Sequence, residues 1–256
     1  MKTIAISGKG GTGKSTLSAL IIRWLNDHEY GPILAVDADS NVNLNDLLGV
    51  RVEETVGAIR EELKKSAHKL PGGMTKQEFL EYKIHASLRE TRDFDLIAMG
   101  RPEGPGCYCY ANNLLRDILK TLSDNYKVIV IDNEAGMEHL SRRMTQKIDF
   151  LLIVSDPSAR GIRAAGKISK LLTELDTRVG KKLLVLNRVK GTIPDILEKL
   201  IEEFGLDLFS SIPEDEILLQ TDQSGKPIWK IEEDSPAYQA VHRMMGELME
   251  RGKNGV

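Results

Sequence analysis

The sequence predicts an α/β protein built on a doubly wound, mostly parallel sheet. Short apolar runs rich in Ile, Val and Leu recur along the chain. Their apolar residues are consecutive rather than alternating, as in parallel strands that are buried on both faces. Longer stretches with a helical period separate most of these runs. Strand followed by helix, repeated, is the pattern of doubly wound folds.

The predicted elements follow one another in a regular order. The apolar runs predict strands at residues 3–7, 33–37, 94–99, 127–132, 150–155, 183–187 and 208–212. Helical spacing is clearest in residues 17–25 and 114–122. Residues 51–92 interrupt this order, because they are rich in charge, show no clear strand and carry a Pro-Gly-Gly turn between two helix-like stretches. We therefore expect a single domain over residues 1–256 with a helical insertion at 51–92.

Composition argues against several classes of protein. Lys plus Arg number 35 and Asp plus Glu 38, a net charge of -3, which does not suit a surface devoted to polyanions. The longest apolar run is residues 150–154, whereas a membrane span needs about 20 residues. The 2 cysteines are too few for a disulfide framework and favour a reducing compartment. We expect a soluble, cytoplasmic protein.

A phosphate-binding motif follows the first predicted strand. It reads Gly8-Lys9-Gly10-Gly11-Thr12-Gly13-Lys14-Ser15 and matches the pattern G-x-x-x-x-G-K-[ST] between a strand and a helix. The backbone N–H groups of such a loop close around phosphates, and the following helix directs its positive end at them. We expect Lys14 to reach the β and γ phosphates and Ser15 to give its hydroxyl to Mg²⁺, with Thr16 beside them.

A second lysine in this loop, Lys9, gives the form K-G-G-x-G-K-[ST]. This form resembles the deviant Walker A motif of the MinD, ParA and nitrogenase iron protein family. In that family the extra lysine reaches across a dimer to the partner's nucleotide. The resemblance therefore implies a MinD-like P-loop NTPase fold, a homodimer, and ATP hydrolysis in which Lys9 and Lys14 are catalytic.

Two acidic segments follow other predicted strands, at the edge where open α/β sheets bind ligands. They are Asp37-Ala38-Asp39-Ser40-Asn41 and Asp132-Asn133-Glu134-Ala135-Gly136. The family resemblance implies that Asp39 positions and activates the attacking water, that Asp132 holds Mg²⁺ through water, and that Gly136 lets the backbone approach the γ-phosphate. Ser15, Asp39 and Asp132 are thus the expected Mg²⁺ residues, and Asp37 supports the site. A helix cap or turn is the alternative for any single Asp here.

Two later segments resemble the family's base-recognition segments. They are Asn187-Arg188 and Pro213-Glu214-Asp215. The amide of Asn187 can pair with the adenine edge, while the backbone near Pro213 encloses the ring. A structural turn is the alternative for Asn187. The chain lacks the N-K-x-D tetrad of GTPases, so we expect ATP and ADP as its nucleotides.

The cysteines form one pair, Cys107 and Cys109, in a loop that we place at residues 101–111, at the ligand edge of the sheet. Two thiolates are half of a tetrahedral metal site. A symmetric dimer would bring four sulfurs together, a set suited to Zn²⁺, another soft divalent metal or an iron–sulfur cluster. Two inert thiols, or a strained vicinal disulfide, are the alternatives.

Residues 100–109 and 132–140 together resemble the CooC-type ATPases, the nickel-insertion factors of carbon monoxide dehydrogenase, with a related branch that serves acetyl-CoA synthase. This resemblance implies an ATP-hydrolysing metallochaperone that dimerises with nucleotide and metal. Its cofactors would be ATP or ADP, Mg²⁺, and Ni²⁺ or Zn²⁺ at the cysteine pair. Its partners would be a second copy and a nickel enzyme. Glu134 has no assigned role.

Two other functions stay open at this point. One is a ParA- or MinD-like positioning ATPase that binds DNA or a membrane-associated partner, and the other is a nitrogenase-type reductase. Residues 237–252 carry Glu247 and Glu250 and so do not form a basic membrane-binding tail. The cations at 142–170 fit a solvated helix face. We expect neither nucleic acid nor membrane as a partner.

Overall fold

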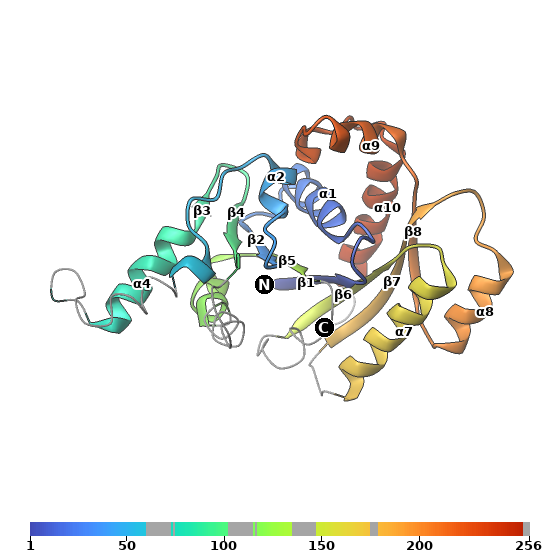
Figure 1. Ribbon diagram of the computed structural model, residues 1–256, viewed down its shortest axis with the longest axis horizontal. Helices are drawn as coiled ribbons and strands as arrows, with labels where there is room; N and C mark the ends of the chain where they lie inside the picture. The colour runs from blue at the N-terminus through green and yellow to red at the C-terminus, as the bar shows by residue number, and fades with distance from the viewer. Residues whose placement is uncertain are drawn as a thin grey trace.

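The computed structural model describes residues 1–59, 73, 75–101, 115, 117–134, 147–174 and 179–252. Its centre is an eight-stranded sheet in the order β3-β4-β2-β5-β1-β6-β7-β8 (Figure 1). All the neighbouring strands are parallel except β3 and β4. The predicted doubly wound, mostly parallel α/β fold is confirmed.

The strands are β1 (Lys2–Gly8), β2 (Ile33–Ala38), β3 (Arg89–Glu90), β4 (Asp95–Ala98), β5 (Val128–Asn133), β6 (Ile148–Ser155), β7 (Val179–Val189) and β8 (Leu208–Pro213). The helices with described bounds are α1 (Lys14–Asp27), α2 (Leu44–Leu48), α4 (Lys76–Ser87), α7 (Ala159–Glu174), α8 (Asp195–Glu203), α9 (Glu216–Gln223) and α10 (Pro236–Arg251). Two 3-10 turns are η2 (Ser123–Asn125) and η3 (Ile228–Lys230). None of these helices is long and apolar enough to cross a membrane.

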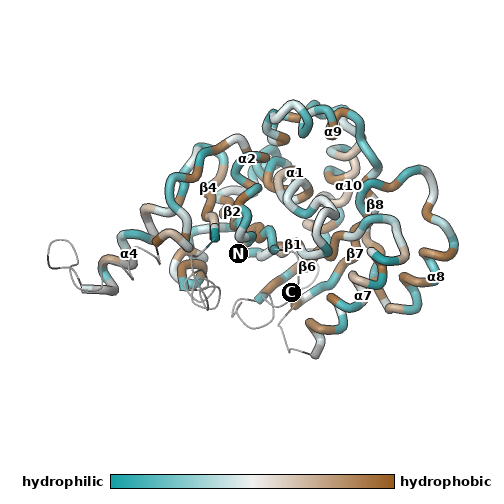
Figure 2. Tube along the Cα trace, viewed as in Figure 1, coloured by the Kyte–Doolittle hydropathy of each residue, from teal (hydrophilic) through white to brown (hydrophobic). Residues whose placement is uncertain are grey.

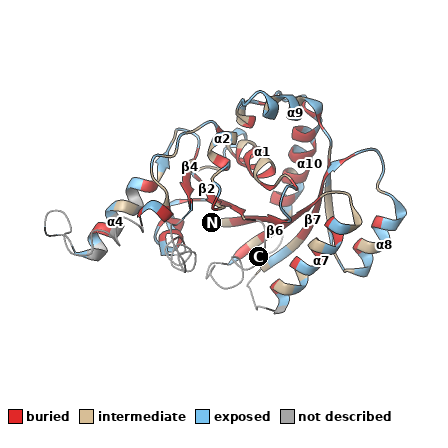
Figure 3. Ribbon diagram, in the orientation of Figure 1, coloured by how far each residue is buried: buried red, intermediate tan, exposed pale blue. Residues whose placement is uncertain are grey.

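Helices cover both faces of the sheet, so that the central strands β1, β2, β5 and β6 are buried along nearly their whole length (Figures 1 and 3). On one face α1, α2 and α10 pack against residues such as Ile4 and Ile6. On the other face α7 and α8 pack against residues such as Ala5. Successive residues of β1 therefore enter opposite cores, as the pleat of a strand requires. This double burial explains the consecutive apolar runs in the sequence, which Figure 2 shows as brown segments along the strands.

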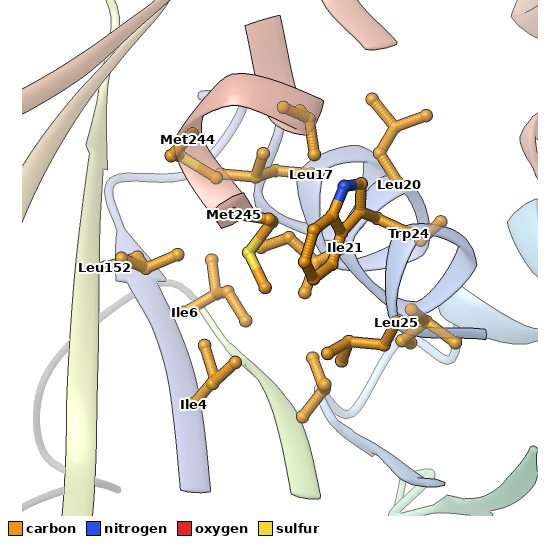
Figure 4. Packing of buried hydrophobic residues seen from close by; sticks show 14 of the residues in the cluster. Ile4, Ile6, Leu17, Leu20, Ile21, Trp24, Leu25, Leu152, Met244 and Met245 are labelled. Carbon is orange, nitrogen blue, oxygen red and sulfur yellow. The ribbon is translucent and has the colours of Figure 1, made fainter. Parts of the chain in front are cut away.

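The packing of α1 fixes the phosphate loop that precedes it. Figure 4 shows Leu17, Ile21 and Trp24 of α1 among residues of β1 and α10. Leu17 is 2% exposed and Ile21 is fully buried. Burying one such aliphatic side chain contributes about 1.5–3 kcal/mol. The start of α1 is thus held firmly at the end of β1.

The structure corrects the predicted strand boundaries at several points. The interruption at 51–92 contains a strand after all, because β3 pairs antiparallel with β4. Both residues of β3 are exposed, so they carry no apolar signal. β7 begins four residues before the predicted strand at 183–187, and these four residues are half-buried or exposed. Hydrophobic patterning detects the buried part of a strand and misses an exposed end.

The region predicted as a helical insertion contains α4, which Figure 1 places beyond the edge of the sheet. Thr75 and Glu78 form a reciprocal cap at its start, with the Thr75 N–H donating to the Glu78 carboxylate at 2.8 Å and the Glu78 N–H to the Thr75 hydroxyl at 3.2 Å. An ion pair of 3.0 Å joins Lys83 to Glu54. The helical structure at 76–87 is what the sequence led us to expect there.

Candidate functional site

The carboxyl ends of the parallel strands carry two adjoining cavities. The larger has a volume of about 610 Å³ and lies over the phosphate loop. It is lined by residues that follow β1, β2 and β5 together with two from β7 and α9, namely Gly10, Gly11, Gly13, Lys14, Ser15, Thr16, Asp39, Asn41, Asn43, Asp46, Leu47, Glu134, Arg188 and Asp222. The smaller, of about 250 Å³, lies between the ends of β7 and β8 and the helix α9. Together they form one groove, which we call the ligand groove.

Glycines and one threonine give the phosphate loop its shape. Gly13 has a φ of 87°, and a Cβ added there would lie 2.4 Å from Nδ2 of Asn187. A Cβ at Gly8 would lie 2.2 Å from the carbonyl oxygen of Val154 on the neighbouring strand. The Thr12 hydroxyl donates to the Lys9 carbonyl oxygen at 2.9 Å and closes the loop. Larger residues at these glycines would clash, so the spacing of the motif follows from steric fit.

The first turn of α1 points into the larger cavity. Its N-cap residue, Gly13, has no side chain to cap the helix, so the first N–H groups are available to an anion. Lys14 is buried with 8% exposure, while Ser15 and Thr16 are half-buried on the same wall. Lys9 is exposed and does not line the cavity. The loop therefore presents one buried cation inward and one cation outward.

Asp37 organises the segment that follows β2. One carboxylate oxygen accepts the N–H of Asp39 at 3.1 Å, and the other accepts those of Asn43 and Leu44 at 3.0 and 2.9 Å. The side chain is fully buried. These bonds agree with the predicted supporting role. Asp39 itself lines the cavity, and one of its oxygens accepts the Asn41 N–H at 2.8 Å.

Asp132 is the buried carboxylate of the site. It lies opposite Asp37 in the register of β5 and β2 and is 1% exposed, and neither of its side-chain oxygens has a hydrogen-bond partner among the described residues. Burial raises its pKa to about 7, and the nearby Asp37 carboxyl adds to this, against the opposing effects of Ser15 and Lys14. Carboxylate and hydroxyl oxygens are ligands suited to Mg²⁺. Asp132 and Ser15 therefore fit a Mg²⁺ ion or the water around it.

Nucleotide-free protein is expected to lose thermal stability as the pH rises from about 4 to about 7. Burial raises the pKa of Asp132 to about 7 and that of Asp37 to about 6, so the folded chain keeps protons that the unfolded chain releases near pH 4. The stability that these two protonated carboxyls provide is fully present below their pKa in the unfolded chain. It is lost as the pH rises past their pKa in the folded chain. Without Mg²⁺, the unfolding midpoint should fall by a few degrees between about pH 5 and about pH 7.5. Asp132→Asn should flatten this slope, and equal slopes in the two proteins would contradict the prediction.

Glu134 links the two acidic segments. Its carboxylate accepts a hydrogen bond from the Ser40 hydroxyl at 3.1 Å, and it lines the larger cavity. The preceding Asn133 donates its amide to the Ile6 carbonyl oxygen at 2.8 Å, which ties the end of β5 to β1. The position of Glu134 thus couples the segment after β2 to the segment after β5. Gly136 lies outside the described residues.

The predicted base-recognition residues meet at the smaller cavity, although each of them except Pro213 already uses its side chain within the protein. Asn187 donates its amide to the Thr12 carbonyl oxygen at 2.8 Å and accepts the Arg188 N–H at 3.0 Å. Arg188 has a φ of 60° and extends its guanidinium to the Gly11 carbonyl oxygen at 3.2 Å. Asn187 therefore braces the phosphate loop, a contact that neither the predicted adenine pairing nor the alternative of a structural turn had described. Pro213 and Glu214 line the cavity as expected.

Asp215 uses its carboxylate within the protein. One oxygen accepts the N–H groups of Ile217 and Leu218 at 2.8 and 3.2 Å and caps α9. The other accepts the Ser235 hydroxyl at 2.5 Å and the Ala237 N–H at 2.9 Å at the start of α10. These bonds lower the pKa of Asp215 despite its burial. Asp215 lines the cavity while its side chain positions the two helices around it.

Sequence reasoning missed the apolar wall of the smaller cavity. That wall is formed by Leu218 and Leu219 of α9 and by Ile228 of η3. It also missed Asp222, which lines both cavities. The apolar triplet 217–219, directly after the predicted Pro213 segment, was the signal that could have indicated a flat hydrophobic ligand. An aromatic base between Pro213 and these side chains would suit this wall.

Cys107 and Cys109, and most of the loop predicted at 101–111, lie outside the described residues. In the part of the chain that the structure does describe, no group of three or more His, Cys, Asp or Glu is arranged to hold a metal ion. The strand leading toward the cysteines, β4, runs parallel to β2 and ends beside it, with Ala98 opposite Asp37. The chain thus leaves the sheet toward the cysteines at the edge that carries the ligand groove.

Comparisons with known proteins relate the chain to nucleotide-binding proteins. Residues 3–228 match the CobQ/CobB/MinD/ParA nucleotide binding domain. An uncharacterized ATP-binding protein of Methanocaldococcus jannaschii is 42% identical over 97% of this chain and 98% of its own. The carbon monoxide dehydrogenase accessory protein CooC of Rhodospirillum rubrum is 28% identical over 97% of this chain and 96% of its own.

A solved structure shares the fold. The septum site-determining protein MinD of Pyrococcus horikoshii OT3, in complex with Mg-ADP, matches with a TM-score of 0.71 over 98% of this chain and 97% of its own, at 23% identity. The match over almost the whole length of both chains places the eight-stranded sheet and its phosphate loop in a known architecture. The chain belongs to the CobQ/CobB/MinD/ParA nucleotide-binding family and is an ATPase with the MinD-like P-loop fold.

Proposed function

We propose that this ATPase is a maturation factor that binds Ni²⁺ or Zn²⁺ at its cysteine pair and drives nickel insertion into an enzyme of the carbon monoxide dehydrogenase or acetyl-CoA synthase kind. The observation that carries the proposal is the pair Cys107 and Cys109 in a chain similar to CooC over nearly its full length. Thiolates are the protein ligands that soft divalent metals prefer. The metal is the cargo of this reaction rather than a resident cofactor.

In this proposal a dimer supplies the two further thiolate ligands that one chain lacks. One chain offers two thiolates, whereas tetrahedral zinc and nickel thiolate sites use four ligands. A two-fold axis through the cysteine loops of two copies would give a symmetric set of four. Because β4 leads to this loop from the edge that carries the ligand groove, nucleotide and metal would act on the same surface of the dimer.

The nucleotide site would control that dimer. Lys14 and the N–H groups at the start of α1 would bind the phosphates, and Asp132 and Ser15 would hold Mg²⁺. Asp39 would orient and deprotonate the attacking water. Lys9, exposed on the outer side of the loop, would reach the nucleotide of the partner copy. Hydrolysis would therefore follow dimer formation and release the metal or the client.

Metal titration with and without nucleotide tests the proposal. Under anaerobic conditions, Ni²⁺ or Zn²⁺ should bind about tenfold more tightly with a non-hydrolysable ATP analogue, since the coupling of two sites is typically 1–3 kcal/mol. Native mass spectrometry should show one metal per two chains. The double variant Cys107→Ala, Cys109→Ala should lose this binding, while Tyr108→Phe in the same loop should keep it. Unchanged metal affinity in the double variant would refute the proposal.

A second candidate is a ParA- or MinD-like positioning ATPase, and one observation favours it. Arg160, Arg163, Lys167 and Lys170 are all exposed and recur every three or four residues, which places them on one face of α7. The sequence had indicated scattered cations. ATP-dependent retention of duplex DNA, lost in an Arg163→Ala, Lys167→Ala variant, would favour this function over metal delivery.

A further inference from the structure

The two cavities of the ligand groove meet at four residues. Gly13, Thr16, Arg188 and Asp222 line both the larger cavity over the phosphate loop and the smaller cavity near Pro213. In a nucleotide the ribose joins the phosphates to the base. If the phosphates lie over the loop and the base lies in the smaller cavity, the ribose lies at this junction. Asp222 is the acidic residue there.

Asp222 differs from the other carboxylates around the groove in having no internal partner. In the described ranges, no hydrogen bond or ion pair engages its side chain, which is exposed near the end of α9. Asp215, by contrast, accepts four hydrogen bonds, and Asp37 accepts three. The fold does not need the Asp222 carboxylate for capping or packing. It faces the groove with both oxygens available.

The chemistry of a carboxylate limits what it can bind at this place. An ionised carboxylate only accepts hydrogen bonds, so it repels phosphate oxygens and favours hydroxyl donors. A ribose offers two such donors side by side, at C2′ and C3′. Dinucleotide-binding folds use an acidic residue for ribose hydroxyls in the same chemical way. We propose that Asp222 is a specificity-determining residue that binds the 2′ and 3′ hydroxyls of the ribose and so selects ribonucleotides over deoxyribonucleotides.

This inference rests on the ligand groove being the nucleotide site but is independent of the metal, the client and the dimer. It concerns which nucleotide the chain accepts. Arg188, whose guanidinium is held at the Gly11 carbonyl oxygen, lies at the same junction and leaves the hydroxyl contacts to Asp222. The positive charge of Arg188 attracts the phosphates, and the negative charge of Asp222 accepts hydrogen bonds from the hydroxyls.

Calorimetric titration of the full chain with ADP, 2′-deoxy-ADP and 3′-deoxy-ADP in the presence of Mg²⁺ tests the inference. The wild-type chain should bind ADP about tenfold more tightly than either deoxy analogue, since each analogue loses a hydrogen bond to a charged acceptor. Asp222→Ala should bind all three equally. Removing the charge also reduces repulsion of the phosphates, so the ratio of affinities, and not the affinity for ADP alone, is the readout.

Two further variants make the result specific. Asp222→Asn removes the charge and keeps one acceptor oxygen, so it should retain part of the preference for ADP. Glu216→Ala removes an exposed acid of the same helix that lines neither cavity, and it should leave the ratio unchanged. Equal binding of the three nucleotides by the wild-type chain, or an undiminished preference in Asp222→Ala, would overturn the inference. If the groove were not the nucleotide site, Lys14→Ala would instead bind all three nucleotides as tightly as the wild-type chain does.

Discussion

Replacing Lys14 by alanine is expected to weaken the binding of ATP and ADP by about a hundredfold or more. Lys14 is buried beside the first turn of α1, and it is the lysine of the phosphate loop that lines the larger cavity. Each hydrogen bond between a cation and a phosphate oxygen is worth about 1.5–3 kcal/mol, so two such contacts account for this loss. Calorimetric titration with Mg²⁺ and ADP measures it directly.

Lys9→Ala is the matched control, because Lys9 has the same charge and lies in the same loop. Its side chain is exposed and lines neither cavity. The variant should bind nucleotide as the wild-type chain does. If Lys9 acts on the nucleotide of a partner copy, as proposed, the variant should nevertheless lose ATP turnover. Equal loss of nucleotide binding in the two variants would show that Lys9, like Lys14, binds the nucleotide of its own chain.

The phosphate side of the groove could be predicted from the sequence because each of its parts is local. Gly13, Lys14 and Ser15 lie within three consecutive positions, and steric limits on the loop fix where glycine must stand. Asp37 and Asp132 each lie one residue before the end of a buried strand, and parallel strands bring their carboxyl ends to one edge. Local signals of this kind can be interpreted from the sequence without knowledge of the tertiary contacts.

The base side could not be predicted as well, because long-range contacts assemble it. Leu219 and Asp222 belong to a short helix whose start depends on Asp215, and Asp215 in turn binds Ser235 at the head of α10. Asn187 shows the same difficulty in another form. Its amide is engaged by the Thr12 carbonyl oxygen, 175 positions away in the chain. No motif spacing encodes such a partner, and the resemblance to the family's base-recognition segments suggested a contact with the base instead.

Asp37 and Asp39 also illustrate what the hydrophobic pattern of a sequence leaves open. Asp39 and Asp37 are separated by one residue, yet the structure gives them opposite environments. Asp37 is fully buried and saturated with backbone N–H groups, whereas Asp39 is half-buried on the cavity wall. Residues two apart in a strand share one face, so the difference arises because β2 ends at Ala38, between the two aspartates.

Replacing Asp39 by alanine is expected to lower ATP turnover by about a hundredfold to ten-thousandfold, the usual contribution of a positioned general base. Binding should survive, because the phosphates are held by the loop and α1 rather than by this carboxylate. Removing a negative charge from the cavity wall also reduces its repulsion of the triphosphate, so affinity for ATP should stay equal or rise. Phosphate release measures turnover, and sedimentation with ATP measures whether the dimer persists.

Asp39→Asn separates the chemical role from the structural one. In the native chain an Asp39 oxygen accepts the Asn41 N–H at 2.8 Å, and an asparagine carbonyl oxygen can accept the same bond. The amide cannot take a proton from water, however. Asp39→Asn should therefore keep the fold of the segment and still lose turnover as fully as Asp39→Ala. Retained turnover in Asp39→Asn, or loss of nucleotide binding in Asp39→Ala, would show that Asp39 shapes the loop and that another group activates the water.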